Sequence, residues 1–205
     1  MLKVGLTGGV ASGKSTVLEM FARRGAHVVR ADEVAHQLIS PGNAVYERVV
    51  AEFGREILNL DGTINRPKLA SLAFPNRTRE LNAIVHPAVL EAEDRWAEEI
   101  LMRDPKAIVI EEAALLIEAG GHKRMDHVIV VTCPFETKVE RFASRSGLSL
   151  DAARAEVTRR MAAQMSDAEK SALADYVIDS SGTLQHVEQQ VESIWHELTH
   201  HFNAQ

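Results

Sequence analysis

The stretch GLTGGVASGKST, residues 5–16, decides how the rest of the chain is interpreted. Gly8 is followed by four residues and then by Gly13, Lys14 and Ser15, which fits the G-x-x-x-x-G-K-[ST] pattern of a phosphate-binding loop. The glycines allow a tight turn in which several backbone N–H groups point into one concavity that suits anionic oxygens. Lys14 adds a positive charge that would neutralise charge developing between the β- and γ-phosphates, and the Ser15 hydroxyl is placed to ligate Mg²⁺.

We therefore expect the loop to bind a nucleoside triphosphate. The residues expected to hold it are Gly8, Gly9, Ala11, Ser12, Gly13, Lys14, Ser15 and Thr16.

The residues on either side of the loop have the pattern that the motif requires. Residues 2–7 are a short apolar run that predicts a buried strand. Residues 16–24 have apolar positions at helical spacing and are followed by Gly25, which suits a helix C-terminus. That helix would present its positive dipole end to the phosphates. The alternative is an ordinary glycine turn followed by a lysine that is there by chance. It does not explain why the expected strand, loop and helix occur in the order that the motif requires.

Four further short runs rich in valine and isoleucine are separated by helical stretches. They lie at residues 27–31, 107–110, 127–131 and 176–178. This alternation predicts an α/β protein with a five-stranded, mostly parallel sheet and helices on both faces. The last helix, roughly residues 183–202, has an apolar stripe formed by Val187, Val191, Ile194 and Leu198.

Two stretches are longer than a crossover between neighbouring strands requires. The first separates the second and third strands and predicts helices over 43–54, over 65–74 with Asn65 as cap, and from Pro87 onward. The second is rich in arginine, and Gly147 divides it into two helices. Because such helical insertions commonly close over a ligand, we expect a single domain with a substrate-binding insertion and a lid. The expected parts are a core (about 1–36, 105–135 and 167–205), the insertion (about 37–104) and the lid (about 136–166).

Composition excludes several classes of protein. The net charge of −6 argues against nonspecific binding of nucleic acid. Cys133 is the single cysteine, so no intramolecular disulfide can form, which is typical of a reducing compartment. No apolar run approaches the ~18 residues that a membrane span needs, and because an expected strand begins at residue 2 we expect no signal peptide. We therefore expect a cytoplasmic protein without a membrane partner. We expect it to be a monomer, and the sequence leaves an oligomer open as the alternative.

Acidic residues follow the second and third predicted strands, at the sheet edge where ligands of open α/β sheets gather. Asp32 could accept the proton of an attacking hydroxyl, or it could simply cap the helix that follows. Glu111 or Glu112 could reach Mg²⁺ through water, or each could be a solvated carboxylate at the edge.

Motifs along the whole chain resemble those of the dephospho-coenzyme A kinase family. In chain order they are GLTGGVASGKSTV, ADEVAH, PG (41–42), FG (53–54), DGTINRPKL, LNAIVHP, LLIEAG, ERFASR, RRMAAQMS and ADYVID followed by SG. The phosphate loop alone is shared by many families, whereas ADEVAH together with LNAIVHP and RRMAAQM is much more specific.

The resemblance implies a three-layer phosphate-loop kinase fold and the transfer of the γ-phosphate of ATP to the ribose 3′-hydroxyl of dephospho-coenzyme A. It implies that Asp32 is the catalytic aspartate beside Lys14 of the loop. Arg66 and His86 match substrate-binding positions, and Arg141 and Arg145 match arginines of the lid.

The chain departs from the family pattern at three positions, Arg30, Ala114 and Ser180. The change to Ala114 could alter a turn, and Ser180 puts an adenine contact at that position in doubt. A kinase of another small molecule, such as a nucleoside monophosphate, remains the alternative because its loop and lid would look similar. The sequence HELTH at 196–200 fits a zinc-protease pattern, but its histidines lie opposite the apolar stripe and are expected to face solvent.

Overall fold

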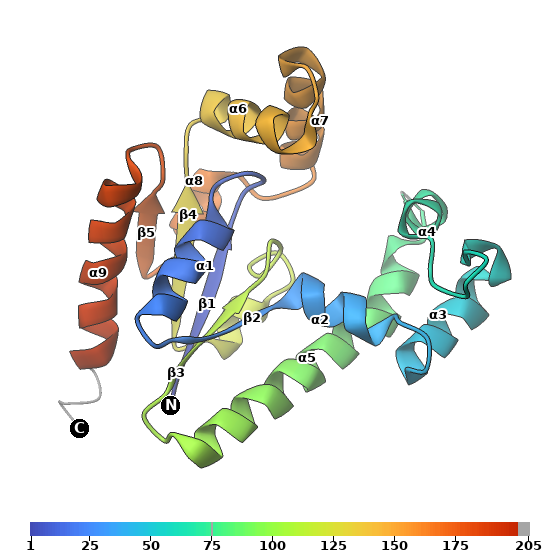
Figure 1. The fold of residues 1–205 in the computed structure, drawn as a ribbon, viewed down its shortest axis with the longest axis horizontal. Coiled ribbons are helices and arrows are strands. Elements are labelled where there is room, and N and C mark those ends of the chain that lie inside the picture. The colour runs from blue at the N-terminus through green and yellow to red at the C-terminus, as the bar shows by residue number, and fades with distance from the viewer. Residues whose placement is uncertain (75, 201–205) are drawn as a thin grey trace. The chain divides into compact units, whose positions relative to one another are not determined.

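The structure is a computed structural model that describes residues 1–74 and 76–200. The chain divides into two compact units (Figure 1). The sheet unit comprises Met1–Val28 and Ile100–Gln205, and the helical unit comprises Val29–Glu99. None of the described helices is long and apolar enough to span a bilayer.

The sheet has five strands in the order β2-β3-β1-β4-β5. They are β1 (Leu2–Gly8), β2 (His27–Arg30), β3 (Ile108–Glu112), β4 (His127–Thr132) and β5 (Tyr176–Asp179). The central strand β1 pairs in parallel with β3 and β4, and β4 pairs in parallel with β5. Because the neighbouring residues Leu6 and Thr7 point to opposite faces of β1 and are both fully buried, this strand is covered on both faces, as is typical of a parallel sheet. The predicted α/β class and sheet are confirmed.

Two helices of the sheet unit, α1 (Lys14–Arg23) and α9 (Leu184–His200), pack side by side against the sheet (Figure 1). The predicted stripe of α9 is confirmed, since all four of its apolar residues are buried in the main core. His196 and His200 are exposed, and no group of three or more metal-ligating side chains forms among residues 1–74 and 76–200. Residues 201 and 202 of the predicted helix lie outside the described residues.

The predicted lid segment forms two helices, α6 (Phe135–Ser146) and α7 (Leu150–Ala162). Gly147 lies between them with a φ of 68°, a left-handed conformation that favours glycine. The short helix α8 (Asp167–Ser171) follows and begins with a capping box between Ser166 and Glu169. The predicted break at Gly147 is confirmed.

The helical unit contains α2 (Ala31–Leu38), α3 (Ala44–Phe53), α4 (Arg66–Ala73) and most of α5 (Thr78–Arg103). These helices enclose a separate core around Val49, Phe53, Ile57 and Leu69. The Asn65 side chain accepts a hydrogen bond of 3.1 Å from the Lys68 N–H, so the predicted cap is confirmed.

The prediction that a helix begins at Pro87 is wrong. Helix α5 begins nine residues earlier, at Thr78, and Pro87 lies inside it. A proline within a helix loses one backbone hydrogen bond and costs about 3 kcal/mol. Ile84 and Val89 are buried on either side of Pro87, and their packing offsets this cost.

Candidate functional site

The phosphate-loop sequence folds as the motif requires, between the end of β1 at Gly8 and the start of α1 at Lys14. Gly13 has a left-handed conformation (φ 92°) directly before the helix. Ala11 has a φ of 54°, and it is the one non-glycine residue with a positive φ among the described residues. Strained backbone of this kind is found mainly where a site imposes it, and here it turns the loop.

Gly8 is required where β1 enters the loop. A Cβ atom on Gly8 would lie 2.3 Å from the main-chain oxygen of Val131 and 2.8 Å from Oγ of Ser12. Both distances are shorter than any real contact, so only glycine allows the loop to approach β4 this closely.

The side chains at the start of α1 are placed for phosphate chemistry. Nζ of Lys14 donates hydrogen bonds to the main-chain oxygens of Gly8 and Gly9, at 3.0 and 3.1 Å, and so lies over the loop. Ser15 and Thr16 are exposed in the first turn of the helix, with their hydroxyls accessible. The loop therefore combines backbone donors, a lysine ammonium and accessible hydroxyls at one helix N-terminus.

Arg141 on α6 reaches this loop through Ser180. Its two terminal nitrogens donate to Oγ and to the main-chain oxygen of Ser180, at 2.9 and 2.6 Å. Oγ of Ser180 in turn donates to the main-chain oxygen of Ser12 at 2.6 Å. Ser180, which departs from the family pattern, therefore links the loop to a predicted lid arginine.

A second basic residue of α6 lies directly against the loop and was missed in the sequence. Lys138 is 1% exposed, and its Nζ donates a hydrogen bond of 2.5 Å to Asp167 at the start of α8. A Cβ atom on Gly9 would lie 3.0 Å from Nζ of Lys138 and 3.1 Å from Oδ1 of Asp167. The backbone of Gly9 therefore packs on a buried ion pair.

Another buried lysine lies at the turn that follows β3. Lys170 is fully buried, and its Nζ contacts Oε1 of Glu118 at 3.0 Å and the main-chain oxygen of Ala114 at 3.1 Å. The hydroxyl of Thr7 also donates to that oxygen, at 3.3 Å. Ala114, another departure from the family pattern, thus lies in a turn held by two side-chain donors.

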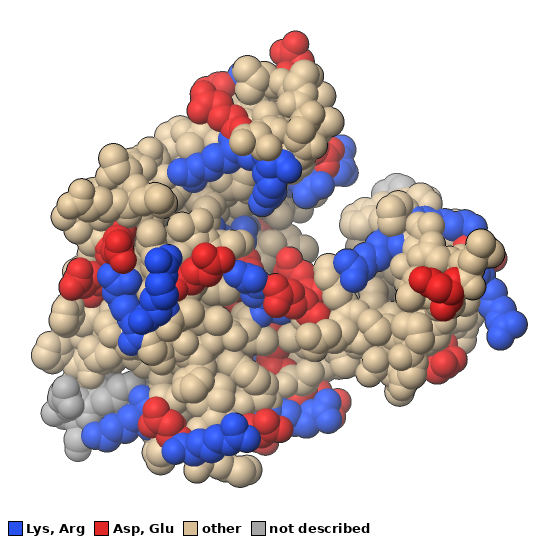
Figure 2. Space-filling view, in the orientation of Figure 1, with Lys and Arg blue, Asp and Glu red and all other residues tan. Residues whose placement is uncertain are grey.

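Arg145 is placed differently from Arg141. It is exposed, and its guanidinium lies 5.7 Å from the ring centroid of Phe142. Arg160 of α7 contacts the same ring at 5.2 Å. Figure 2 shows basic side chains gathered along the side of α6 and α7 that is turned toward the strand ends of the sheet unit. The structure therefore brings Arg141 to the loop, whereas Arg145 belongs to the exposed surface of the helix pair.

Two of the ionisable groups with shifted pKa values in this region are Cys133 and Glu156. Burial raises the pKa of the Cys133 thiol, an effect that the nearby Arg141 and Lys138 charges partly oppose. Hydrogen bonds from Arg159 and then Arg160 lower the pKa of Glu156 on α7 to about 2.

Glu111 and Glu112, at the end of β3, are 2% and 5% exposed. The alternative that either is a solvated carboxylate at the sheet edge is therefore wrong. Burial of two neighbouring carboxylates at a strand end is unusual and is compatible with a role near a cation.

In the helical unit, Asp32 lies in the first turn of α2 and is exposed. The residue at the N-cap position is Arg30, and no side chain caps this helix. The alternative that Asp32 is a helix cap is therefore wrong. Arg30 instead forms an ion pair of 2.9 Å with Glu33, the residue that follows Asp32.

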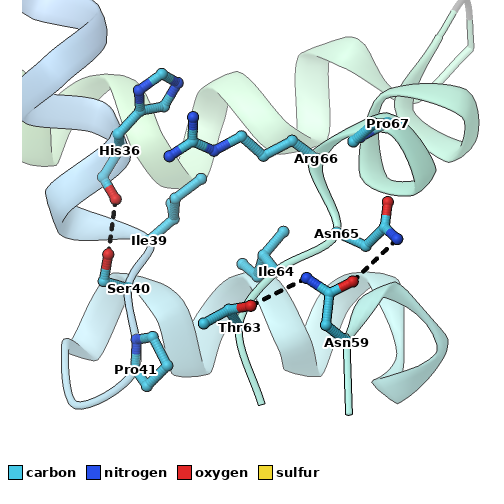
Figure 3. A pocket seen from close by; sticks show the side chains of 10 residues that line it. All are labelled: His36, Ile39, Ser40, Pro41, Asn59, Thr63, Ile64, Asn65, Arg66 and Pro67. Atoms are coloured by element: carbon cyan, nitrogen blue, oxygen red, sulfur yellow. Dashed lines mark hydrogen bonds between the residues drawn. The ribbon is translucent and has the colours of Figure 1, made fainter. Parts of the chain in front are cut away.

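Arg66 lines a cavity of about 490 Å³ that lies within the helical unit (Figure 3). The cavity is formed by the end of α2, the turn before α4 and the first residues of α4. His86 is exposed on α5 and is not among the residues that line this cavity. The two predicted substrate-binding residues are therefore not brought together in it.

Comparisons with known proteins agree with the motifs. The family model described as dephospho-CoA kinase matches residues 2–186. A dephospho-CoA kinase of Geobacter sulfurreducens is 45% identical over 195 residues, which cover 94% of this chain and 96% of that protein.

Two solved structures are also similar along almost their whole length. A structure titled TT1252 from Thermus thermophilus has a TM-score of 0.77 and 33% identity, covering 96% of this chain and 97% of that one. A dephospho-CoA kinase from Campylobacter jejuni has a TM-score of 0.66 and 26% identity, covering 96% of each chain. The resemblance seen in the motifs is confirmed, and the chain belongs to the dephospho-CoA kinase family.

Proposed function

We propose that the protein transfers the γ-phosphate of ATP to the ribose 3′-hydroxyl of dephospho-coenzyme A, giving coenzyme A and ADP. The observation that carries this proposal is the phosphate loop of residues 8–16, folded as strand, loop and helix in a chain that matches the family over residues 2–186. An ATP-dependent kinase follows from the family. The identity of the acceptor hydroxyl is the finer step that we propose here.

Each proposed role follows from where a side chain lies within its own unit. Backbone N–H groups of the loop and the Lys14 ammonium bind the phosphates and stabilise the charge that develops on them. The Asp32 carboxylate, which is not used in a cap, accepts the proton of the attacking hydroxyl. As that O–H bond breaks, an O–P bond to the γ-phosphate forms and the bond to ADP breaks.

The residues of the loop fit Mg²⁺ as well. The exposed Ser15 hydroxyl stands at the start of α1, and Glu111 and Glu112 are buried at the end of the strand next to β1. Ser15 would hold the ion directly, and one of the two glutamates would act through water. When bound, the ion would neutralise part of the phosphate charge.

We also propose that α6 and α7 act as a lid over the nucleotide. Lys138 and Arg141 attach α6 to the loop side of the unit, whereas Gly147 separates α7 from it. Movement is therefore expected mainly in α7, with Arg141 already close to the phosphates.

A panel of acceptors with ATP as donor tests the proposal. We expect phosphorylation of dephospho-coenzyme A at a rate far above that of any nucleoside monophosphate. Removal of the new phosphate by a 3′-nucleotidase, followed by mass spectrometry, would locate it on the ribose 3′-oxygen. If a nucleoside monophosphate were the preferred acceptor, the alternative activity, that of a nucleoside monophosphate kinase, would replace the one proposed here.

A further inference from the structure

A carboxylate lies in direct contact with the backbone of the phosphate loop. A Cβ atom on Gly9 would lie 3.1 Å from Oδ1 of Asp167, so only the missing side chain of Gly9 leaves room for this oxygen. A loop that binds phosphates gains affinity from nearby positive charge and loses it to nearby negative charge. The charge of Asp167 therefore works against the binding of phosphates unless a cation offsets it.

Lys138 is the cation that lies at this carboxylate. Its Nζ donates a hydrogen bond of 2.5 Å to Oδ2 of Asp167 and would lie 3.0 Å from a Cβ atom on Gly9. The side chain of Lys138 is 1% exposed and that of Asp167 is 26% exposed. Because water hardly reaches the ammonium, its charge is screened less than that of a surface lysine and offsets the carboxylate more fully.

Lys138 and Lys14 contact the loop in different ways. Nζ of Lys14 donates to the main-chain oxygens of Gly8 and Gly9, and the side chain is only partly buried, so a ligand can reach it. Lys138 is enclosed by protein, so it lies behind the loop rather than in the concavity that receives phosphates. Lys138 can therefore act on a nucleotide only through the charge of Asp167 and the backbone of Gly9.

The elements that carry the two charges are fixed to the structure around the loop. Helix α6, which carries Lys138, packs in one apolar cluster with Val10 and Ala11 of the loop. Helix α8, which carries Asp167, is held by the fully buried Lys170, whose Nζ contacts Glu118 at 3.0 Å. The pair is therefore in place before a nucleotide binds, and its field needs no rearrangement to act on the phosphates.

We infer that Lys138 is a positioning residue for ATP: it neutralises Asp167 behind the phosphate loop and so keeps the loop attractive to the triphosphate. The inference rests on the phosphate loop as the ATP site of the proposed function, and it adds Lys138 to the residues that determine ATP affinity. A charge effect has a sign. A variant that leaves the carboxylate alone weakens ATP, whereas one that leaves the ammonium alone does not.

The test uses variants that change the charge of the pair and keep its approximate shape. They are Lys138→Met, Asp167→Asn, the double variant and Lys138→Arg, which keeps the positive charge. Calorimetry without acceptor measures the Kd of a non-hydrolysable ATP analogue, and steady-state kinetics at saturating dephospho-coenzyme A give kcat and the KM for ATP. A thermal melt shows that each variant is folded at the temperature used.

Arg154→Met is the matched control. It removes one positive charge from the same helix pair and leaves Glu136, the partner of Arg154 at 2.7 Å, without that ion pair. Both side chains are well exposed, at 47% and 63%, so solvent screens the charge that remains. The change in net charge equals that of Lys138→Met, and only the distance from the loop and the burial differ.

We expect Lys138→Met to weaken the analogue about tenfold, as one poorly screened unit charge near a polyphosphate would. Asp167→Asn should bind it at least as tightly as wild type, and the double variant and Lys138→Arg should bind it nearly as wild type does. The loss in Lys138→Met should shrink at high salt. The KM for ATP should rise with little change in kcat, because the charge acts on bound ATP and on the transition state alike.

Three results would overturn the inference. Equal weakening in Lys138→Met and Asp167→Asn, with the double variant no better, would show that the pair only supports the fold of the loop. Unchanged affinity in Lys138→Met would show that the phosphates do not sense Asp167. Weakening in Arg154→Met as large as in Lys138→Met would assign the effect to the overall charge of the helix pair.

These results are separate from a failure of the proposed function. Turnover of dephospho-coenzyme A by the wild type would leave that function intact in all three cases. Absence of that turnover would reject the proposed acceptor, and the affinities of the variants for the ATP analogue would still decide the role of Lys138.

Discussion

Lys138 and Asp167, on helices far apart in the sequence, form an ion pair of 2.5 Å against the backbone of Gly9. The two partners are buried unequally, since the side chain of Lys138 is 1% exposed and that of Asp167 is 26% exposed. Removal of one partner from a buried pair costs more when the charge that remains cannot reach water.

We therefore expect Asp167→Asn to destabilise the protein by about 3 kcal/mol and Lys138→Met by about 1 kcal/mol, because only the remaining lysine is fully buried. Urea denaturation measures both free energies of unfolding. The double variant should be less destabilised than the sum of the single changes. Equal losses, or a larger loss for Lys138→Met, would contradict this account of the pair.

Lys14→Met should lower turnover on the order of 10²-fold or more, because it removes the ammonium that meets the developing phosphate charge while keeping much of the chain length. The substitution also removes the hydrogen bonds of Lys14 to Gly8 and Gly9, and we expect this to lower the free energy of unfolding by about 1 kcal/mol. Steady-state kinetics at saturating ATP and a thermal melt separate the two effects. Turnover near that of wild type would reject the role of Lys14.

Asp32→Asn should abolish most of the turnover while ATP binding and thermal stability stay near those of wild type. Since Asp32 caps no helix, even Asp32→Ala should cost less than about 0.5 kcal/mol, below the usual cost of losing a cap. Glu33→Gln is the matched control, because Glu33 stands in the same first turn and is paired with Arg30. If both variants lost activity equally, the charge of the helix end would be responsible rather than a base.

Arg141→Lys keeps the positive charge but loses the planar fork that reaches Ser180. We expect turnover with dephospho-coenzyme A to fall about tenfold, with little change in the KM for ATP, as for a contact that strengthens in the transition state. Arg145→Lys should have a smaller effect, because Arg145 is exposed beside Phe142. Turnover and acceptor-free ATP hydrolysis equal to wild type in both variants would show that these arginines are surface charges.

The parts of the fold that the sequence predicted are those that local pattern determines. The phosphate loop, the strands and the glycine breaks depend on short-range periodicity and backbone conformation, and Gly147 has the φ that its position in the pattern predicted. The predicted start of α5 was wrong because Pro87 is a strong local signal for the first turn of a helix. The packing of the buried residues Ile84 and Val89, before and after it, overrides that signal.

Parts of the candidate site could not be predicted because they depend on distant contacts. Ser180 binds Ser12 across 168 residues, and no local pattern records that distance. One feature of the sequence could have indicated that Lys138 is buried: it lies four residues before Phe142 and therefore on the same, buried face of α6. A lysine on a buried face needs an anion, but only the fold identifies Asp167 as its partner.

Stability should depend on pH through Glu156 of α7. Hydrogen bonds from Arg159 and Arg160 lower its pKa to about 2 in the folded protein, below the usual 4.5. Its contribution is therefore complete above about pH 4.5 and is lost as the pH falls toward 2. Because both arginines are well exposed and solvent screens the pairs, we expect no more than about 1 kcal/mol.

Glu156→Gln should therefore be less stable than wild type at pH 7, and the difference in unfolding free energy should shrink as the pH approaches 2. Urea denaturation across this range measures it. Glu140→Gln on α6 is the control, since no hydrogen bond or ion pair of Glu140 links it to another described residue. A difference that stays constant with pH, or one that Glu140→Gln reproduces, would show that the arginine pairs of Glu156 do not stabilise the folded helix pair.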